Sequence, residues 1–164
     1  MGVPDQEIPE IIKDGLGGAY TRDNPVNCVK ICSLEIINNL LDKGITPRKS
    51  GKETPYYCST KDLEIAYIRG LIDGDGYIGS TQNRMGIVGS KEICEYVKNF
   101  ISKNIHNIEN NHVHEHGIIY KLEINGKKQT AIILKALYQN AKIYLDRKYQ
   151  LYINKYSEQA DELP

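Results

Sequence analysis

The stretch "YIRGLIDGDGYIG", Tyr67–Gly79, holds four glycines and two carboxylates within thirteen residues. Apolar residues at helical spacing give way to a short alternating run, which predicts a helix that ends at about Asp73 and a strand after it. Glycine inside a helix costs about 0.8–1.0 kcal/mol relative to alanine. These glycines therefore need a compensating contact.

Ala66, Gly70 and Gly74 follow one another at intervals of four residues, so they share one face of the predicted helix. Small residues at this spacing let two helices approach closely. The chain has one such helix, so its partner would be the same helix of a second copy, related by a two-fold axis. In the alternative interpretation, the glycines loosen and end the helix against the core of its own chain. Both interpretations are open at this point.

Asp75 lies between two glycines, just past the predicted end of the helix. A two-fold axis along the paired helices would bring two Asp75 carboxylates together, where they repel unless cations bridge them. Carboxylate and carbonyl oxygens are ligands that Mg²⁺ prefers, and paired metals suit phosphodiester hydrolysis. For Asp73 we expect a structural role, in which it accepts hydrogen bonds from nearby backbone amides.

From residue 60 onward, hairpins alternate with helices, which predicts an α+β class with an antiparallel sheet covered by helices on one face. The expected helices are 60–73, a second one capped by Ser90 with Ile93, Val97 and Ile101 on one face, 127–139 and 146–156. The expected strands are 76–80, 84–89, 112–116 and 118–124. Before residue 60 we expect a strand at 27–32, a helix at 34–43 capped by Ser33, and a loop or short hairpin.

Alternation along the strands predicts which side chains face the helices. The apolar set is Ile78, Met85, Ile87, Val113, Ile118, Tyr120, Leu122 and Ile124, and the polar set on the other face is Tyr77, Thr81, Arg84, His112, His114, His116, Lys121 and Glu123, with Gln82 and Asn83 at a hairpin tip. A β-ribbon can enter the DNA major groove and read base edges. For the three histidines we favour contact with bases or a place on the polar surface over zinc binding. Arg48, Lys49 and Lys52 lie in a basic loop that suits phosphate contacts.

The net charge of zero hides a basic body between acidic ends. Residues 21–156 carry twenty basic and fourteen acidic residues, whereas residues 1–20 and 157–164 each carry a net charge of −3. A basic body suits phosphate contact. The first residues lack the features of a signal peptide, and no apolar run is long enough to span a membrane, so we expect an intracellular protein.

The segment "IRGLIDGDG", Ile68–Gly76, resembles the LAGLIDADG motif of the homing endonucleases that bear this name. Seven positions carry the resemblance, and Arg69 and Gly74 stand where the motif has alanine. The matching positions are Ile68, Gly70, Leu71, Ile72, Asp73, Asp75 and Gly76. The resemblance covers roughly residues 60–155 and extends loosely to 28–58.

The resemblance implies the αββαββα fold of this family, with a saddle-shaped antiparallel sheet that lies in the DNA major groove. A single motif implies a homodimer that acts on a long, near-palindromic double-stranded site. The last acid of the motif maps onto Asp75 as the metal ligand, with the Gly74 carbonyl beside it, and Mg²⁺, Mn²⁺ or Ca²⁺ could occupy the site. A basic residue near the scissile phosphate maps onto Lys148, with Arg147 as its substitute. A polar glutamine that some members carry after the first hairpin has no counterpart in "VGS".

The expected organisation is an N-terminal arm at 1–27, a partial strand–helix–strand extension at 28–59, a core domain at 60–156 and an acidic tail at 157–164. The expected function is site-specific cleavage of double-stranded DNA with a divalent metal. One alternative is a catalytically inactive relative that serves as an intron RNA maturase or transcription factor. Another is a self-assembling α+β domain unrelated to nucleic acid. The presence of Asp75 and Gly76 argues against the first, because a pure binder needs no acid at the axis, and the basic body and polar sheet face argue against the second.

Overall fold

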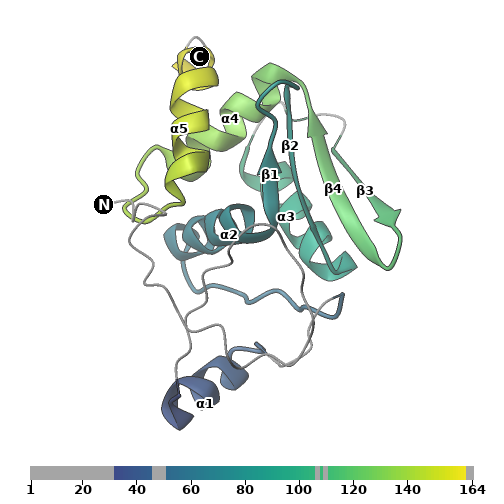
Figure 1. Cartoon of the computed structure of the whole chain (residues 1–164), viewed down its shortest axis with the longest axis vertical. Helices are drawn as coiled ribbons and strands as arrows, with labels where there is room; N and C mark the ends of the chain where they lie inside the picture. Colours follow the sequence, from purple (N-terminus) through teal and green to yellow (C-terminus); the bar gives the residue numbers. More distant parts are fainter. Residues whose placement is uncertain (1–31, 46–50, 106–107, 109–110, 162–164) are drawn as a thin grey trace, which may run out of the picture.

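A computed structural model describes residues 32–45, 51–105, 108 and 111–161. These residues form an α+β fold with a four-stranded antiparallel sheet, as predicted (Figure 1). In chain order the elements are α1 (Leu34–Asp42), α2 (Lys61–Asp75), β1 (Gly76–Ile78), β2 (Arg84–Gly89), α3 (Lys91–Asn104), β3 (Asn111–His116), β4 (Ile119–Asn125), α4 (Lys127–Tyr138), α5 (Asp146–Lys155) and α6 (Ser157–Asp161).

The sheet has the strand order β1-β2-β4-β3, so β2 and β4 lie side by side in its centre. Met85 pairs with Ile124, and Ile87 pairs with Leu122. This register places apolar residues of both central strands on the same face. Helices α3 and α4 cover that face, and α2 packs against its β1 and β2 end (Figure 1).

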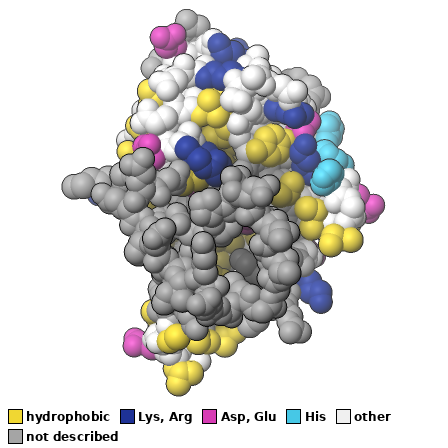
Figure 2. Space-filling model, in the orientation of Figure 1, with side chains coloured by type: hydrophobic (Ala, Val, Ile, Leu, Met, Phe, Trp, Pro, Cys, Tyr) yellow, Lys and Arg dark blue, Asp and Glu magenta, His cyan; other side chains and the backbone are white. Residues whose placement is uncertain are grey.

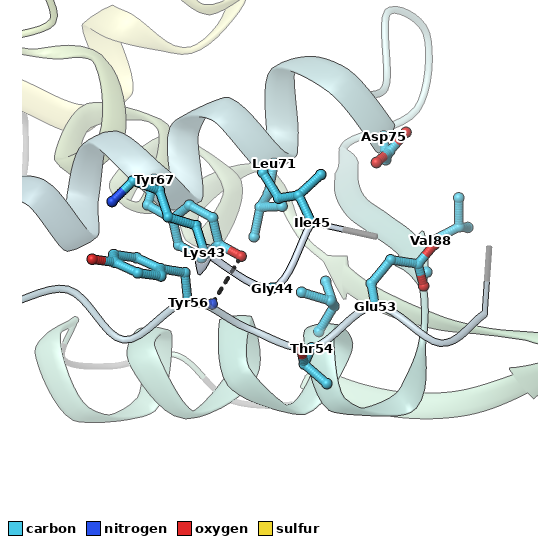
Figure 3. Close-up of a pocket in the computed structure, with 12 residues that line it drawn as sticks. Lys43, Gly44, Ile45, Glu53, Thr54, Tyr56, Tyr67, Leu71, Asp75 and Val88 are labelled. Atoms are coloured by element: carbon cyan, nitrogen blue, oxygen red, sulfur yellow. Dashed lines mark hydrogen bonds between the residues drawn. The ribbon is translucent and has the colours of Figure 1, made fainter. Parts of the chain in front are cut away.

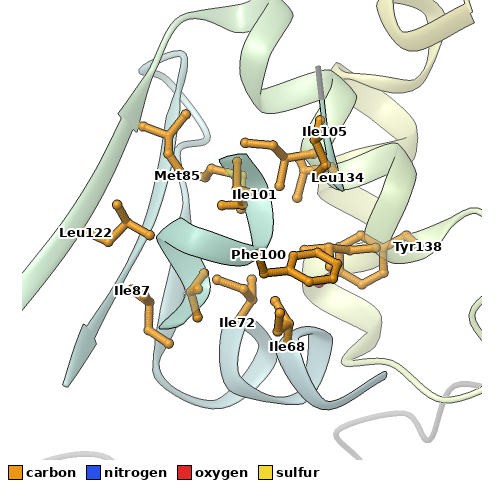
Figure 4. Packing of buried hydrophobic residues seen from close by; sticks show 14 of the residues in the cluster. Ile68, Ile72, Met85, Ile87, Phe100, Ile101, Ile105, Leu122, Leu134 and Tyr138 are labelled. Carbon is orange, nitrogen blue, oxygen red and sulfur yellow. The ribbon is translucent and has the colours of Figure 1, made fainter. Parts of the chain in front are cut away.

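The core lies between this face and the helices (Figure 4). The side chains of Met85, Ile87, Leu122 and Ile124 are fully buried, as the alternation predicts. Ile118 is wrongly assigned to this face, because it is 97% exposed. It occupies the two-residue turn between β3 and β4 beside Gly117, whose φ of +66° suits glycine.

Helix α3 confirms its predicted start, since the Ser90 side chain accepts a hydrogen bond from the Ile93 amide. Helix α2 starts in the same way at Thr60 but runs to Asp75, two residues beyond its predicted end. The short helix α6 lies in the acidic tail, where no helix was expected, and packs against α4 and α5. The end of α2 and the whole of α6 thus depend on tertiary contacts rather than on the neighbouring sequence.

Helix α1 begins and ends as the sequence predicts. Ser33 accepts a hydrogen bond from the Ile36 amide, and Gly44 follows the helix with a φ of +77°. The apolar side of α1 stays largely exposed, including Leu34 at 77%. The predicted strand at 27–32 lies almost entirely outside the described residues, and the described residues 51–59 contain no strand.

Tyrosines in and between the C-terminal helices α4 and α5 pack against one another. Tyr144 and Tyr149 stack with ring centroids 4.1 Å apart, and Tyr138 stacks on Tyr152 at 5.8 Å. Aromatic pairs of this kind contribute about 0.5–1.5 kcal/mol beyond their buried area. They join α4 and α5 on the side of the fold where α2 ends.

Two glycines of β2 give a test of this packing. A Cβ on Gly86 would clash with the Leu122 carbonyl oxygen and lie 2.8 Å from the Tyr77 hydroxyl, whereas on Gly89 it would only touch Ile93 at 3.6 Å. We therefore expect Gly86→Ala to lower the free energy of unfolding by roughly 1–3 kcal/mol and Gly89→Ala to change it far less. Urea denaturation of both variants measures the difference. Equal stabilities would contradict the close approach of β4 and Tyr77 to Gly86.

Candidate functional site

Helix α2 presents four different sides, and each side has a separate environment. Ile68 and Ile72 form the buried core side, and Arg69 and Asp73 form a side that is tied by hydrogen bonds to the α4–α5 region. Tyr67, Leu71 and Asp75 form the side that lines a cavity. Ala66, Gly70 and Gly74 form the fourth side, which is open.

The open side consists of the small residues that were predicted to pair two helices. Ala66, Gly70 and Gly74 are all exposed. Within the described part of the chain, no heavy atom outside α2's own backbone lies within 4 Å of a Cβ built on Gly70 or Gly74. The packing of this chain's described core therefore does not require glycine at either position. The interpretation that these glycines serve their own core gains no support.

The C-terminus of α2 is held by Lys148, which reaches it from α5. The Lys148 ammonium donates hydrogen bonds to the carbonyl oxygens of Ile72 at 2.5 Å, Asp73 at 2.9 Å and Gly76 at 2.6 Å. The last carbonyls of a helix lack partners within the helix, and a cation is stabilised at this end of the helix dipole. Lys148 therefore satisfies the carbonyls that let α2 continue to Asp75.

Lys148 is 4% exposed, so it is a buried lysine rather than a solvated one. Its burial lowers its pKa, as does the charge of Arg147, while the carboxylates of Asp73 and Asp75 oppose this shift. An ammonium has three donors, and here all three bind backbone carbonyls. A contact between Lys148 and a phosphate would require one of these bonds to break. Arg147, its predicted substitute, is exposed in the first turn of α5.

Asp73 has a structural role, but its partners are distant in the chain rather than local. One oxygen accepts a 2.5 Å hydrogen bond from the Tyr138 hydroxyl, and the other accepts a 3.0 Å bond from the Leu145 amide at the start of α5. Arg69, one turn earlier, donates to the carbonyls of Leu137 and Ile143 at 2.8 and 2.9 Å. Burial and the Asp73 bond both raise the pKa of Tyr138. These contacts fix the rotation of α2 about its axis.

Asp75, the last residue of α2, is exposed and lines one end of a cavity of about 290 Å³ (Figure 3). Tyr67 and Leu71 line the same cavity from α2, and Glu53 lines it from the segment that follows α1. The Tyr67 hydroxyl accepts a 3.2 Å bond from the Tyr56 amide, which holds that segment against α2. Among the described residues, the Asp75 carboxylate makes no hydrogen bond.

The oxygen ligands at this end of α2 make an incomplete cation site. Asp75 offers a free carboxylate, and the carbonyls of Gly74 and Asp75 lie beyond the last i to i−4 acceptor of the helix, Ile72. The described residues hold no group of three or more His, Cys, Asp or Glu side chains that could bind a metal. Mg²⁺ is commonly held by one or two carboxylates with water and substrate phosphates. The residues present fit such a site if a second chain or a substrate completes it.

The polar residues predicted to face DNA gather on the side of the sheet that the described helices leave uncovered. Pairing places His112 opposite Glu123, His114 opposite Lys121 and Tyr77 opposite Gly86. Figure 2 shows basic side chains beside the histidines on this part of the surface. The predicted residues on this outward face are Tyr77, Arg84, His112, His114, His116 and Lys121.

The other predicted contacts lie elsewhere. Thr81, Gln82 and Asn83 are exposed at the tip between β1 and β2. Lys155 holds this tip by donating to the carbonyls of Gly79 and Ser80, both at 2.9 Å, and of Gln82 at 3.2 Å. Arg48 and Lys49 lie outside the described residues.

Sequence reasoning assigned no role to Arg69, Glu53 or Lys155 and recognised Glu123 only as a member of the polar face. Gly86 was the available signal for the cluster around Glu123, because glycine inside a strand often marks the close approach of another group. No local pattern announces the partners of Arg69 and Lys155, which lie 68 or more residues away in the chain.

Comparisons with models of protein families, with curated proteins and with solved structures found no match for this chain. Among the described helices, none has the length and apolar character needed to cross a membrane.

Replacing Lys148 tests the end of α2. We expect Lys148→Met to lower the free energy of unfolding by at least about 2 kcal/mol, because three backbone carbonyls lose their donor. Lys128→Met, at an exposed position of α4, should change it by less than about 0.5 kcal/mol. Chemical denaturation of both variants provides the comparison. If the two are equally stable, the Lys148 ammonium does not hold α2.

Proposed function

We propose that this protein is a site-specific double-strand DNA endonuclease with the LAGLIDADG endonuclease fold, dependent on Mg²⁺ or a similar divalent cation and active as a homodimer. The outward face of the sheet would lie in the major groove of a long, near-palindromic site. The two Asp75 carboxylates would meet at the two-fold axis, each serving the cleavage of one strand.

One observation carries the proposal: the open side of α2 ends at Gly74, directly beside the exposed carboxylate of Asp75. Gly70 and Gly74 each cost helix stability and meet nothing within 4 Å in the described residues. A second copy of α2 packed on this side would explain both glycines. The same pairing would bring together two half-sites that are each too small to hold a metal alone.

The outward face supports DNA as the substrate. It carries Arg84 and Lys121 with three exposed histidines, and its edge joins the exposed tip at Gln82 and Asn83. Arginine, glutamine and asparagine can pair with base edges in the major groove. None of the described helices covers this face, so a two-stranded ribbon can approach a duplex.

The residues at the end of α2 would divide the work. Asp75 and the Gly74 carbonyl would hold the cation, which when bound supplies an activated water and stabilises charge on the phosphate. Lys148 would act as a positioning residue, because it fixes the carbonyls on both sides of Asp75. Arg147 is better placed than Lys148 to contact a phosphate, since it is exposed and beside Lys148 on α5.

The alternative function, nucleic-acid binding without cleavage by a maturase or transcription factor, draws on one observation. The ammonium of Lys148 is bound to backbone rather than directed to solvent. The two functions differ in their need for Asp75, because a protein that only binds nucleic acid needs no metal-binding carboxylate at the two-fold axis.

Asp75→Asn separates these functions. Selection from a randomised duplex library in Mg²⁺ should first yield cleaved sites for the wild-type chain. On such a site we expect Asp75→Asn to cut at least about a hundredfold more slowly, because the amide loses the charge that attracts the cation, while DNA binding in Ca²⁺ persists. Cleavage is followed by gel electrophoresis of end-labelled duplex.

Asp62→Asn is the matched control, since Asp62 is an exposed carboxylate in the first turn of α2. It should cleave at the wild-type rate. Full activity of Asp75→Asn would refute the metal-binding role. Binding of DNA without any cleaved site would favour the alternative function.

Gly70→Leu tests the pairing of α2. Position 70 is exposed and a Cβ there meets nothing within 4 Å in the described fold, so we expect a folded chain whose self-association is at least tenfold weaker and whose cleavage falls with it. Ala136→Leu, at an exposed position of α4, is the control for added bulk on a helix. Sedimentation velocity and circular dichroism measure mass and folding. A folded Gly70→Leu variant that dimerises like the control would contradict pairing through this side.

A further inference from the structure

The outward face of the sheet has a carboxylate at its centre. Glu123 lies on the central strand β4, and four side chains converge on it. Its oxygens receive the Tyr77 hydroxyl at 2.9 Å, the Lys121 ammonium at 2.5 Å and the Asn125 amide at 3.3 Å. The Arg84 guanidinium is 3.7 Å away. Both lysine and arginine cations of the face are thus bound to one anion.

Tyr77 reaches Glu123 from the edge strand β1 by crossing β2. The crossing is possible because β2 has glycine at position 86, where a Cβ would lie 2.8 Å from the hydroxyl and 2.9 Å from the ring. The ring also lies near both cations, 5.0 Å from the Lys121 nitrogen and 5.9 Å from the Arg84 guanidinium carbon. These distances suit cation–π attraction, so ring and carboxylate together hold the cations.

The carboxylate keeps its charge over the whole physiological range. Hydrogen bonds from Lys121 first, and from Tyr77 second, lower the pKa of Glu123 to about 2. The side chains of Lys121 and Glu123 are 20% and 21% exposed. The outward face therefore has a fixed, partly buried ion cluster rather than loose surface charges.

A fixed anion has two consequences on a surface that binds DNA. It weakens attraction to phosphates of any sequence, which arises mainly from free lysine and arginine charges. It also fixes two long side chains before binding, which reduces the cost of ordering them, about 0.5–1.5 kcal/mol for each side chain. The first consequence lowers non-specific affinity, and the second favours the duplex whose base edges match the fixed groups.

We propose that Glu123 is a specificity-determining positioning residue, which holds Arg84, Lys121 and Tyr77 in one arrangement and suppresses binding to non-matching DNA. This inference rests on the proposed function, because it takes double-stranded DNA as the ligand. Glu123 acts through its neighbours and need not touch a base itself.

Glu123→Gln tests the inference, because it removes the charge and keeps the shape. Fluorescence anisotropy in Ca²⁺ compares a mixed-sequence duplex with a duplex recovered by selection on the wild-type chain, over a range of salt concentrations. We expect Glu123→Gln to bind the mixed duplex more tightly, with a salt slope steeper by about 0.9 for each cation released to a phosphate. The ratio of selected to mixed affinity should fall by about tenfold, the discrimination of one base contact.

Glu115→Gln is the matched control. Glu115 belongs to the same sheet but is exposed. It pairs with Tyr120 on the face that is turned toward the helices and accepts a 3.1 Å hydrogen bond from the Tyr120 hydroxyl. The substitution makes the same change in net charge without touching the outward face. It should leave both the affinity ratio and the salt slope near their wild-type values.

Tyr77→Phe separates positioning from charge and decides the case if Glu123→Gln does not fold. It removes one bond to the carboxylate and leaves the charge, so we expect a smaller fall in the affinity ratio with an unchanged salt slope. The inference is overturned if Glu123→Gln matches Glu115→Gln, or if it changes both affinities equally. It is also overturned if Glu123→Gln fails to fold and Tyr77→Phe keeps the wild-type ratio. A wild-type chain that binds no duplex would instead overturn the proposed function, and the inference with it.

Discussion

The buried ammonium of Lys148 is the interaction on which the rest of the site depends. It closes the C-terminus of α2 by donating to the carbonyls of Ile72, Asp73 and Gly76, where the carbonyls of a helix run out of partners within the helix. Removing this cation from water is costly, and the hydrogen bonds with the negative end of the helix dipole offset that cost. With the end of α2 fixed, the chain can turn at Gly76 directly into β1, and Asp75 stays at the surface.

Helix α2 can hold so many roles because each side has its own chemistry. Ile68 and Ile72 anchor it in the core, while Arg69 and Asp73 set its rotation through bonds to the α4–α5 region. These ties leave the side with Gly70 and Gly74 open. Under the proposed function, the same fifteen-residue helix would then hold the core together, pair two chains and present the metal ligand.

The sequence predicts those features that depend on neighbours in the chain. Ser33, Thr60 and Ser90 begin their helices because a cap acts over three residues, and strand alternation separates Met85 from Arg84 because its period is local. Ile118 is misassigned since one turn glycine interrupts the alternation. The bonds of Lys148 span 72 to 76 residues, and the cluster around Glu123 depends on the register of three strands. Gly86 marks a close approach but not the groups that make it, and no local pattern specifies the partners of Lys148 or Glu123. The extra length of α2 and the fixed ion cluster therefore emerge only in the fold.

The central claim is that two copies of α2 meet so that paired Asp75 carboxylates bind divalent cations on DNA. Native mass spectrometry of the protein with a selected duplex in Ca²⁺ tests it most directly, because one spectrum counts chains, duplexes and bound ions together. The account predicts two chains on one duplex, with more calcium than the free duplex carries. A single chain on the duplex, or a complex that takes up no additional calcium, would contradict it.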